Sequence, residues 1–368
     1  MRRKGCLNWR LGSDDPIKGD IMKFKFIPEN KEEEDLLKSH SEVRPILEVY
    51  LPIVQGRALM AGVHLKIFET IAHKALSLEQ LVDTLSLNPE SLGLLLNVLV
   101  CSNYLVYKKE KYSLTELSKK TLLPDAECQV WGGIEYARIR WKMLDHLEEV
   151  IKTGKGVDIH KDFLNTHENW TFYQRSMYEH AVVGADEIAN NIPVREGAKK
   201  MLDIGGAHGL YGAKICQMHP PMTSTVFDLP DAVKTAESLA KEAGIDNIVD
   251  FKPGNALKDD LGSDYDLIFA SNLCHHFTEQ ENQKFLCKIY AALKEGGSVA
   301  LFGFTPPDLE NNQNLSNALM SLMFKVNSGG RNYAPSDYTN WAESAGFKQV
   351  DIQPKFAKKN KILMVGIK

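Results

Sequence analysis

The chain has no excess of basic residues, because its 44 Lys and Arg are outnumbered by 48 Asp and Glu, giving a net charge of -4. A general nucleic-acid binder usually carries a strong positive balance, so nucleic acid is not an expected partner. The six cysteines show no C-x-x-C spacing, which favours reduced thiols over disulfides or a zinc site. Reduced thiols are typical of the cytoplasm, where we expect this protein to be.

Long uninterrupted apolar runs are also missing. The most apolar early stretch, residues 45–72, is broken by Glu48, Pro52 and Lys66, and falls short of a membrane span of about 20 apolar residues. The basic residues at positions 2–4 are not followed by the apolar core of a secretory signal. We therefore predict buried helices in residues 45–72, and neither export nor a membrane partner.

Residues 43–125 have the pattern of a small, mainly helical domain. Ser77-Leu-Glu-Gln80 is a capping-box sequence ahead of an apolar helix, and Pro89 sits at a favoured position just inside the next one. The apolar runs at 104–107 and 112–114 then predict a β-hairpin. Two helices followed by a hairpin indicate a winged helix.

The second helix of this domain argues against DNA binding. A DNA-reading helix exposes Arg, Lys, Asn or Gln to bases and phosphates, whereas residues 92–100 are mostly leucine and valine. The apolar stretch from Val49 to Ile71 also exceeds what so small a domain can bury alone. We therefore expect a homodimer held by residues 43–125, behind an N-terminal extension, 1–42, that is partly disordered.

The second half of the chain alternates short apolar runs with helical patterns, which is typical of a doubly wound α/β sheet. We assign residues 191–368 to this domain and residues 126–190 to connecting helices that contribute to a small-molecule cleft. Seven strands are predicted, the last two close enough to form an antiparallel pair; their positions are 201–204, 224–227, 249–251, 266–269, 299–302, 350–352 and 362–365.

A glycine-rich turn follows the first predicted strand, in Asp203-Ile-Gly-Gly-Ala-His-Gly209. Glycines allow unusual dihedral angles and let a ligand approach the backbone closely. Asp228 follows the second strand about 20 residues later, where a carboxylate accepts hydrogen bonds from ribose hydroxyls. An alternative interpretation is that Asp228 caps the helix beginning at Pro230. The turn matches neither G-x-G-x-x-G nor the Lys-Ser/Thr of a P-loop, so a dinucleotide or ATP is not expected.

These motifs resemble the small-molecule O-methyltransferases of plants and bacteria, a group of class I S-adenosylmethionine (SAM) enzymes with an N-terminal winged-helix dimerisation domain. The resemblance runs from about residue 43 to the end and is carried by Leu202–Gly206, Phe227–Pro230, Gly254–Ala256, Asn272–Phe277, Leu293–Gly297, Gly330–Tyr333 and Trp341–Phe347. It implies a Rossmann-like seven-stranded methyltransferase sheet and methyl transfer from SAM, with S-adenosylhomocysteine as the product.

The resemblance also implies site residues. Those expected to bind the cofactor are Asp203, Gly205, Gly206, Gly209, Asp228, Leu229, Asn255, Ala256 and Asn272. Those expected to line the substrate pocket are Tyr173, Met177, His276, Met320, Met323 and Phe324. No Cys or carboxylate cluster accompanies the two histidines at ligand spacing, so no metal is expected.

His275 corresponds to the general base of the family, and the acceptor is expected to be a hydroxyl of a small aromatic or polyketide-like metabolite. Histidine titrates near pH 6 to 7 and suits that role. Phe302 and Asn332 stand where the family often has carboxylates that orient the base. His276 is expected to contribute little, because adjacent side chains on one turn seldom point to the same place.

Two alternatives remain open on the sequence. Methylation at carbon or nitrogen would tolerate the loss of both carboxylates. A SAM-binding regulator without catalysis would combine intact cofactor motifs with an inactive substrate cleft. The sequence identifies no acceptor.

Overall fold

The computed structural model describes residues 31–39, 42, 44–310 and 314–368. The described residues form two compact units, with the boundary between Arg140 and Trp141. The boundary lies inside the segment predicted to connect the two domains. The disorder expected in residues 1–42 lies mostly outside the described residues, although Lys31–Ser39 forms helix α1.

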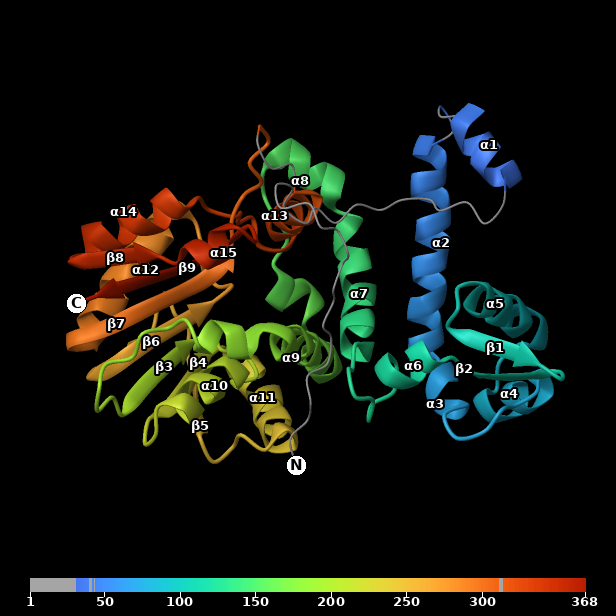
Figure 1. The fold of residues 1–368 in the computed structure, drawn as a ribbon, viewed down its shortest axis with the longest axis horizontal. Coiled ribbons are helices and arrows are strands. Elements are labelled where there is room, and N and C mark those ends of the chain that lie inside the picture. The colour runs from blue at the N-terminus through green and yellow to red at the C-terminus, as the bar shows by residue number, and fades with distance from the viewer. Residues whose placement is uncertain (1–30, 40–41, 43, 311–313) are drawn as a thin grey trace. The chain divides into compact units, whose positions relative to one another are not determined.

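The first unit is helical with one hairpin (Figure 1). After α1 come α2 (Arg44–His64), α3 (Ile67–Thr70), α4 (Leu78–Leu85), α5 (Pro89–Cys101), β1 (Leu105–Lys108), β2 (Lys111–Leu114) and α6 (Glu116–Thr121), and α7 (Trp131–Leu144) spans the boundary. The predicted capping box is confirmed, since Ser77 and Gln80 exchange side-chain and backbone hydrogen bonds. Pro89 begins α5, and β1 pairs antiparallel with β2 as expected.

Helix α2 differs from the expectation that its apolar residues are buried. It carries many exposed apolar side chains, including Val49 at 56%, Tyr50 at 63% and Val54 at 47% exposure. By length and composition alone α2 could cross a membrane, so the expectation that its polar interruptions exclude a span is not supported. The prediction that 45–72 is buried holds only in the second half of the segment, from Ala58 onward, where Val63, Ile67 and Phe68 lie in the core with α4 and α5.

The second unit is built on a seven-stranded sheet. Its strands are β3 (Lys200–Ile204), β4 (Thr223–Asp228), β5 (Val249–Pro253), β6 (Tyr265–Ser271), β7 (Leu293–Phe304), β8 (Gln349–Ile352) and β9 (Lys361–Ile367). All seven predicted strands are therefore confirmed. Their order is β5-β4-β3-β6-β7-β9-β8 (Figure 1), and only β9 runs antiparallel to its neighbours.

The helices and turns of this unit are α8 (Leu147–Thr153), the π-helical turn η2 (Ile159–Phe163), α9 (His167–Ala189), α10 (Leu210–Met218), α11 (Pro230–Ala243), the 3-10 turn η3 (Cys274–His276), α12 (Glu279–Ala292), α13 (Leu315–Ser328), α14 (Pro335–Ala345) and α15 (Pro354–Ala357). Of these, α12 and α14 pack on one face of the sheet, and α10, α15 and the end of α9 pack on the other. One core joins Ile268 to Leu286 and Trp341, and the opposite core joins Phe269 to Ile215. The central strands, such as β6, are buried along almost their whole length because both faces of the sheet are covered, whereas the edge strands β5 and β8 are partly exposed.

The order in which successive strands are added to the sheet reverses at its centre, although the strands there are all parallel. From β3 the chain steps outward to β4 and β5, then returns to place β6 on the other side of β3. Open α/β sheets bind ligands outside the carboxyl ends of strands at such a switch point. The loops after β3, β4, β5 and β6 are therefore the expected place for a site.

Candidate active site

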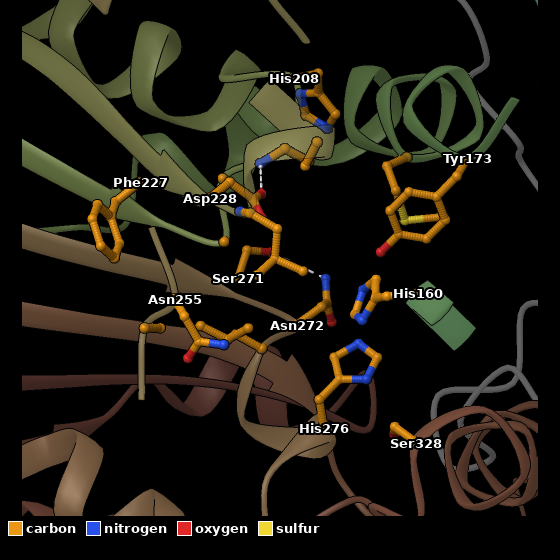
Figure 2. Close-up of a pocket in the computed structure, with 18 of the residues that line it drawn as sticks. His160, Tyr173, His208, Phe227, Asp228, Asn255, Ser271, Asn272, His276 and Ser328 are labelled. Carbon is orange, nitrogen blue, oxygen red and sulfur yellow. Dashed lines mark hydrogen bonds between the residues drawn. The ribbon is translucent and has the colours of Figure 1, made fainter. Parts of the chain in front are cut away.

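A cavity of about 340 Å³ lies in the second unit at these strand ends. Its lining includes ten residues predicted from the sequence, namely Gly205, Gly206, Asp228, Leu229, Asn255, Ala256, Asn272, Tyr173, Met177 and His276. It also includes residues that the sequence analysis missed, among them His160, Trp170, His208, Tyr211, Ser271 and Ser328. Figure 2 shows Asn255 and Phe227 on one side of the cavity and Tyr173, His160 and His276 on the other.

Asp228 links the glycine turn after β3 to the end of β4, on the side of the cavity where the cofactor is expected. Its carboxylate accepts hydrogen bonds from the backbone N–H of Ala207 at 2.9 Å and of Leu229 at 2.7 Å (Figure 2). Burial raises the pKa of Asp228, and these two hydrogen bonds oppose the rise. Leu229, not Asp228, is the N-cap of α11, and no side chain caps that helix. The capping interpretation of Asp228 is therefore wrong.

Two residues that were expected at the cofactor, Asp203 and Gly209, are placed differently. Asp203 is fully buried, and its carboxylate lies beneath Gly206, where an added Cβ would stand 2.5 Å from Asp203 Cγ. Gly209 begins α10 with a φ of +74°, and an added Cβ there would approach Val249 to 2.8 Å. Neither Asp203 nor Gly209 lines the cavity. Both pack against the glycine turn on the side away from the cavity. Ala207 adopts a φ of +49°, so it takes the left-handed conformation that glycine provides elsewhere.

Two asparagines present polar groups to the cavity. Asn255 Oδ1 accepts from the backbone N–H of Leu257 and Lys258, which fixes the direction of its amide. Asn272 Nδ2 donates to Ser271 Oγ at 3.0 Å (Figure 2). Asn272 Oδ1 is buried with no hydrogen-bond partner among the described residues. A bound group with an N–H or a positive charge would satisfy it.

The opposite wall is aromatic. His160 stacks on Trp170 with centroids 5.5 Å apart and an interplanar angle of 10°, and Trp170 meets Tyr173 edge to face. Burial lowers the pKa of His160. Burial also lowers the pKa of His276 to about 3, and the nearby His160 lowers it further. His276 is therefore a neutral hydrogen-bonding group near pH 7, and its pKa lies below the 6 to 7 expected of the base.

The two adjacent histidines point to the same place, contrary to expectation. Their Nε2 atoms are 3.1 Å apart. His276 lines the cavity, whereas His275 is 5% exposed and absent from the lining. His275 instead stacks on Phe324, with centroids 3.5 Å apart.

Three residues of α13 that were predicted to line the substrate pocket lie outside the cavity lining. Phe324 is buried against His275, and Met320 and Met323 are half-buried on the same helix. Only Ser328, at the end of α13, is in the lining. Their role in substrate binding stays a prediction.

The family carboxylate positions are also apart from the cavity. Phe302 packs edge to face on Phe356. Asn332 donates from Nδ2 to the Thr305 carbonyl at 3.4 Å. Neither side chain lines the cavity. Among the described residues no group of three or more His, Cys, Asp or Glu could hold a metal ion.

Gly254, the first residue after β5, gives a test of how tightly this site is packed. An added Cβ would stand 2.2 Å from Cζ of Phe227, a ring that is itself buried. We expect Gly254→Ala to lower the free energy of unfolding by about 1 to 3 kcal/mol, because an overpacked core must shift. Thermal unfolding measures the change.

Gly184 provides the matched control. It lies inside α9 and an added Cβ meets nothing within 4 Å. Gly184→Ala should stabilise the protein by roughly 0.5 to 1 kcal/mol, because alanine loses less backbone entropy in a helix. Equal effects of the two substitutions would contradict the close packing at Gly254.

A cavity at the switch point of an α/β sheet, with an acidic residue at the end of the second strand, is typical of enzymes that bind a nucleotide-containing cofactor. Residues 143–348, more than half of the chain, match the O-methyltransferase domain family, and residues 48–124 match the O-methyltransferase dimerisation domain. The chain belongs to this O-methyltransferase family and is a SAM-dependent methyltransferase.

Individual relatives are distant. The chain is 23% identical over 299 residues to 3-hydroxy-5-methyl-1-naphthoate 3-O-methyltransferase of Streptomyces sahachiroi, covering 80% of this chain and 86% of that protein. It is 28% identical over 206 residues to L-tyrosine C(3)-methyltransferase of Streptomyces lavendulae, covering 54% and 55%. The fold matches human N-acetylserotonin methyltransferase in complex with SAM, with a TM-score of 0.74, 19% identity and coverage of 93% and 99%.

Proposed function

We propose that this protein transfers the methyl group of SAM to a hydroxyl of a small aromatic or polyketide-like metabolite. The observation that carries the proposal is the position of Asp228, whose carboxylate lies beside the glycine turn in the same cavity as an aromatic wall. The family relationship and the O-methyltransferase activity named for the naphthoate relative support oxygen as the acceptor atom.

The residues of the cofactor half fit SAM. Asp228 would accept hydrogen bonds from the ribose hydroxyls, and Gly205 and Gly206 leave the backbone open to the ligand. Asn255 would face the adenine, and the unpartnered Asn272 Oδ1 would accept from the ammonium group. When bound, SAM supplies an electrophilic methyl group on a sulfonium.

The aromatic wall would hold the acceptor. Stacking of His160 on Trp170, with Tyr173 at the edge, presents flat surfaces that suit a planar ring. The residues around it that carry polar atoms are neutral near pH 7, because burial keeps His160 and His276 uncharged. A histidine of the pair after β6 would accept the proton of the acceptor hydroxyl. The family motif indicates His275 as this general base.

Labelled methyl transfer tests this function. Cell extract incubated with the protein and isotopically labelled SAM should yield a labelled aromatic ether, identified by mass spectrometry. A labelled product with the methyl group on carbon or nitrogen would overturn hydroxyl methylation. Binding of SAM with no labelled product from any extract or phenol would favour the regulator.

Carbon methylation is the second candidate. The match to L-tyrosine C(3)-methyltransferase favours it, as does the absence of a carboxylate from positions 302 and 332. A phenol ring is activated for attack from carbon once its hydroxyl has lost a proton, so the same histidines would serve. The position of the label in the product distinguishes the two reactions.

We also propose a homodimer through the first unit, in the cytoplasm. The match to a dimerisation domain and the exposed apolar residues of α2 support the dimer. Light scattering should report twice the chain mass. Replacing both Tyr50 and Val54 by Glu should dissociate the dimer, since charges resist burial in an interface.

Ile151→Glu is the control for this experiment, because Ile151 is 64% exposed but lies on α8 in the second unit. It should leave the dimer intact. A monomeric wild-type protein at micromolar concentration, or one that needs detergent or lipid to stay in solution, would contradict the dimer.

A further inference from the structure

Residues 254–260, the β5 loop, follow β5 and form one wall of the cavity. Residues 254–257 all line the cavity. The loop is a single tight turn, because the backbone N–H groups of Lys258 and Asp259 both donate to the carbonyl oxygen of Asn255, at 3.0 and 2.9 Å. The Asp259 carboxylate closes the turn by accepting from the backbone N–H of Asn255 at 2.8 Å. The shape of this wall therefore depends on what holds the turn.

The turn also sets the direction of the Asn255 side chain. Its Oδ1 atom accepts from the backbone N–H groups of Leu257 at 3.0 Å and Lys258 at 3.2 Å. A backbone N–H can donate only to the oxygen of an amide, so the two atoms of this amide group are not interchangeable. A shift of the turn would move the wall and the Asn255 amide together.

Lys288 of α12 holds the β5 loop from outside the cavity. Its ammonium group donates to the carbonyl oxygen of Ala256 at 2.6 Å and to that of Asp259 at 2.7 Å. Hydrogen bonds from a charged donor are stronger than those between neutral groups. Burial lowers the pKa of Lys288, and the nearby charges of Asp259 and Asp260 partly offset this effect. One side chain thus joins both ends of the turn.

The helix that carries Lys288 is firmly anchored. Phe285, Leu286 and Ile289, its neighbours on α12, are fully buried in the main core of the sheet. Leu257 of the β5 loop packs against the same core. Lys288 therefore ties the cavity wall to a rigid part of the fold.

We infer that Lys288 is a positioning residue for the cofactor, because it holds the β5 loop in the shape that receives the adenine. Lys288 itself is not among the lining residues of the cavity, so it would act through the loop. This inference rests on the proposed placement of the adenine beside Asn255. A wall that is already ordered before the ligand arrives loses less conformational entropy on binding.

Lys288→Met tests the inference, since methionine keeps an unbranched side chain and removes both hydrogen bonds. In the folded full-length protein, calorimetry should show S-adenosylhomocysteine binding weakened by about 5- to 30-fold. 5′-Methylthioadenosine, which has the adenosine but lacks the amino acid, should lose the same factor. Amide hydrogen exchange of the ligand-free variant should become faster in residues 254–260 and stay unchanged in the glycine turn after β3.

Lys284→Met is the matched control. Lys284 lies one turn earlier on α12 and is exposed, so its replacement should leave both affinities within about twofold. Asp259→Ala is the second variant, because it opens the same turn from the side of the loop. Asp259 is exposed, and its replacement should also weaken both ligands.

Unchanged affinity in Lys288→Met would overturn the inference, and Asp259→Ala decides in the same way if Lys288→Met does not fold. A loss for S-adenosylhomocysteine that 5′-methylthioadenosine does not share would also overturn it, because the effect would then lie at the amino acid and not at the adenine. Failure of the wild-type protein to bind SAM or S-adenosylhomocysteine would instead contradict the proposed function.

Discussion

Asp228→Ala should weaken SAM binding by about 1.5 to 3 kcal/mol, or roughly 10- to 150-fold, measured by calorimetry. The carboxylate is placed to accept from ribose hydroxyls, and it already accepts from Ala207 and Leu229. Removing it takes away charge-assisted hydrogen bonds and frees two backbone donors of the loops that border the cavity. S-adenosylhomocysteine should lose a similar amount, because both ligands carry the same ribose.

Asp231→Ala is the matched control for this substitution. Asp231 lies in the first turn of α11, where its side chain is exposed and pairs with Lys234 on the surface. Its replacement should leave SAM affinity within about twofold, because exposed ion pairs contribute little. Unchanged affinity in Asp228→Ala would contradict the ribose role, and tight binding of NAD by the wild-type protein would contradict the cofactor.

The sheet could be predicted from the sequence because its physics is local. A strand buried on both faces is a short apolar run, and the runs at 201–204, 266–269 and 299–302 all became central strands. Asp228 and the glycine turn could be placed for the same reason. Both follow strands directly, and the carboxyl ends of parallel strands meet at one edge.

The aromatic wall could not be predicted in this way. His160 lies in a π-helical turn, η2, and reaches the cavity through its stack on Trp170 of α9. Neither the turn nor the stack has a sequence period, because each depends on packing between segments that are distant from the sheet. The sequence therefore indicated aromatic residues between 126 and 190 without identifying the histidine.

The histidine pair shows a similar limit. Spacing placed His275 and His276 at the end of β6, but their side-chain directions depend on the tight turn η3. Phe324 and Gly330 come from much later in the chain and hold His275 inside. The sequence motif therefore located the histidine pair, whereas tertiary packing sets the direction of each ring.

Asp203→Asn should remove a pH-dependent loss of stability. Burial raises the pKa of Asp203 from 3.8 to about 7. The Gly212 backbone amide lowers this pKa, and the nearby Asp228 charge raises it, both by smaller amounts. Between pH 4 and 7 the folded protein thus holds a proton that the unfolded chain releases. The contribution of Asp203 to the free energy of unfolding therefore falls by roughly 4 kcal/mol as the pH rises from 4 to 7, and it is constant above pH 7.

Buried histidines act in the opposite direction, so the comparison must be made between wild type and variant. Burial lowers the pKa of His208 and His276 to about 3, which makes their contribution to stability rise with pH up to about 6.5. These contributions are shared by both proteins and cancel in the difference. Denaturant unfolding at pH 5 and pH 8 should therefore show Asp203→Asn gaining stability relative to wild type at pH 8. Parallel pH curves for the two proteins would mean that Asp203 is already ionised in the fold at pH 5 and that its pKa is not raised.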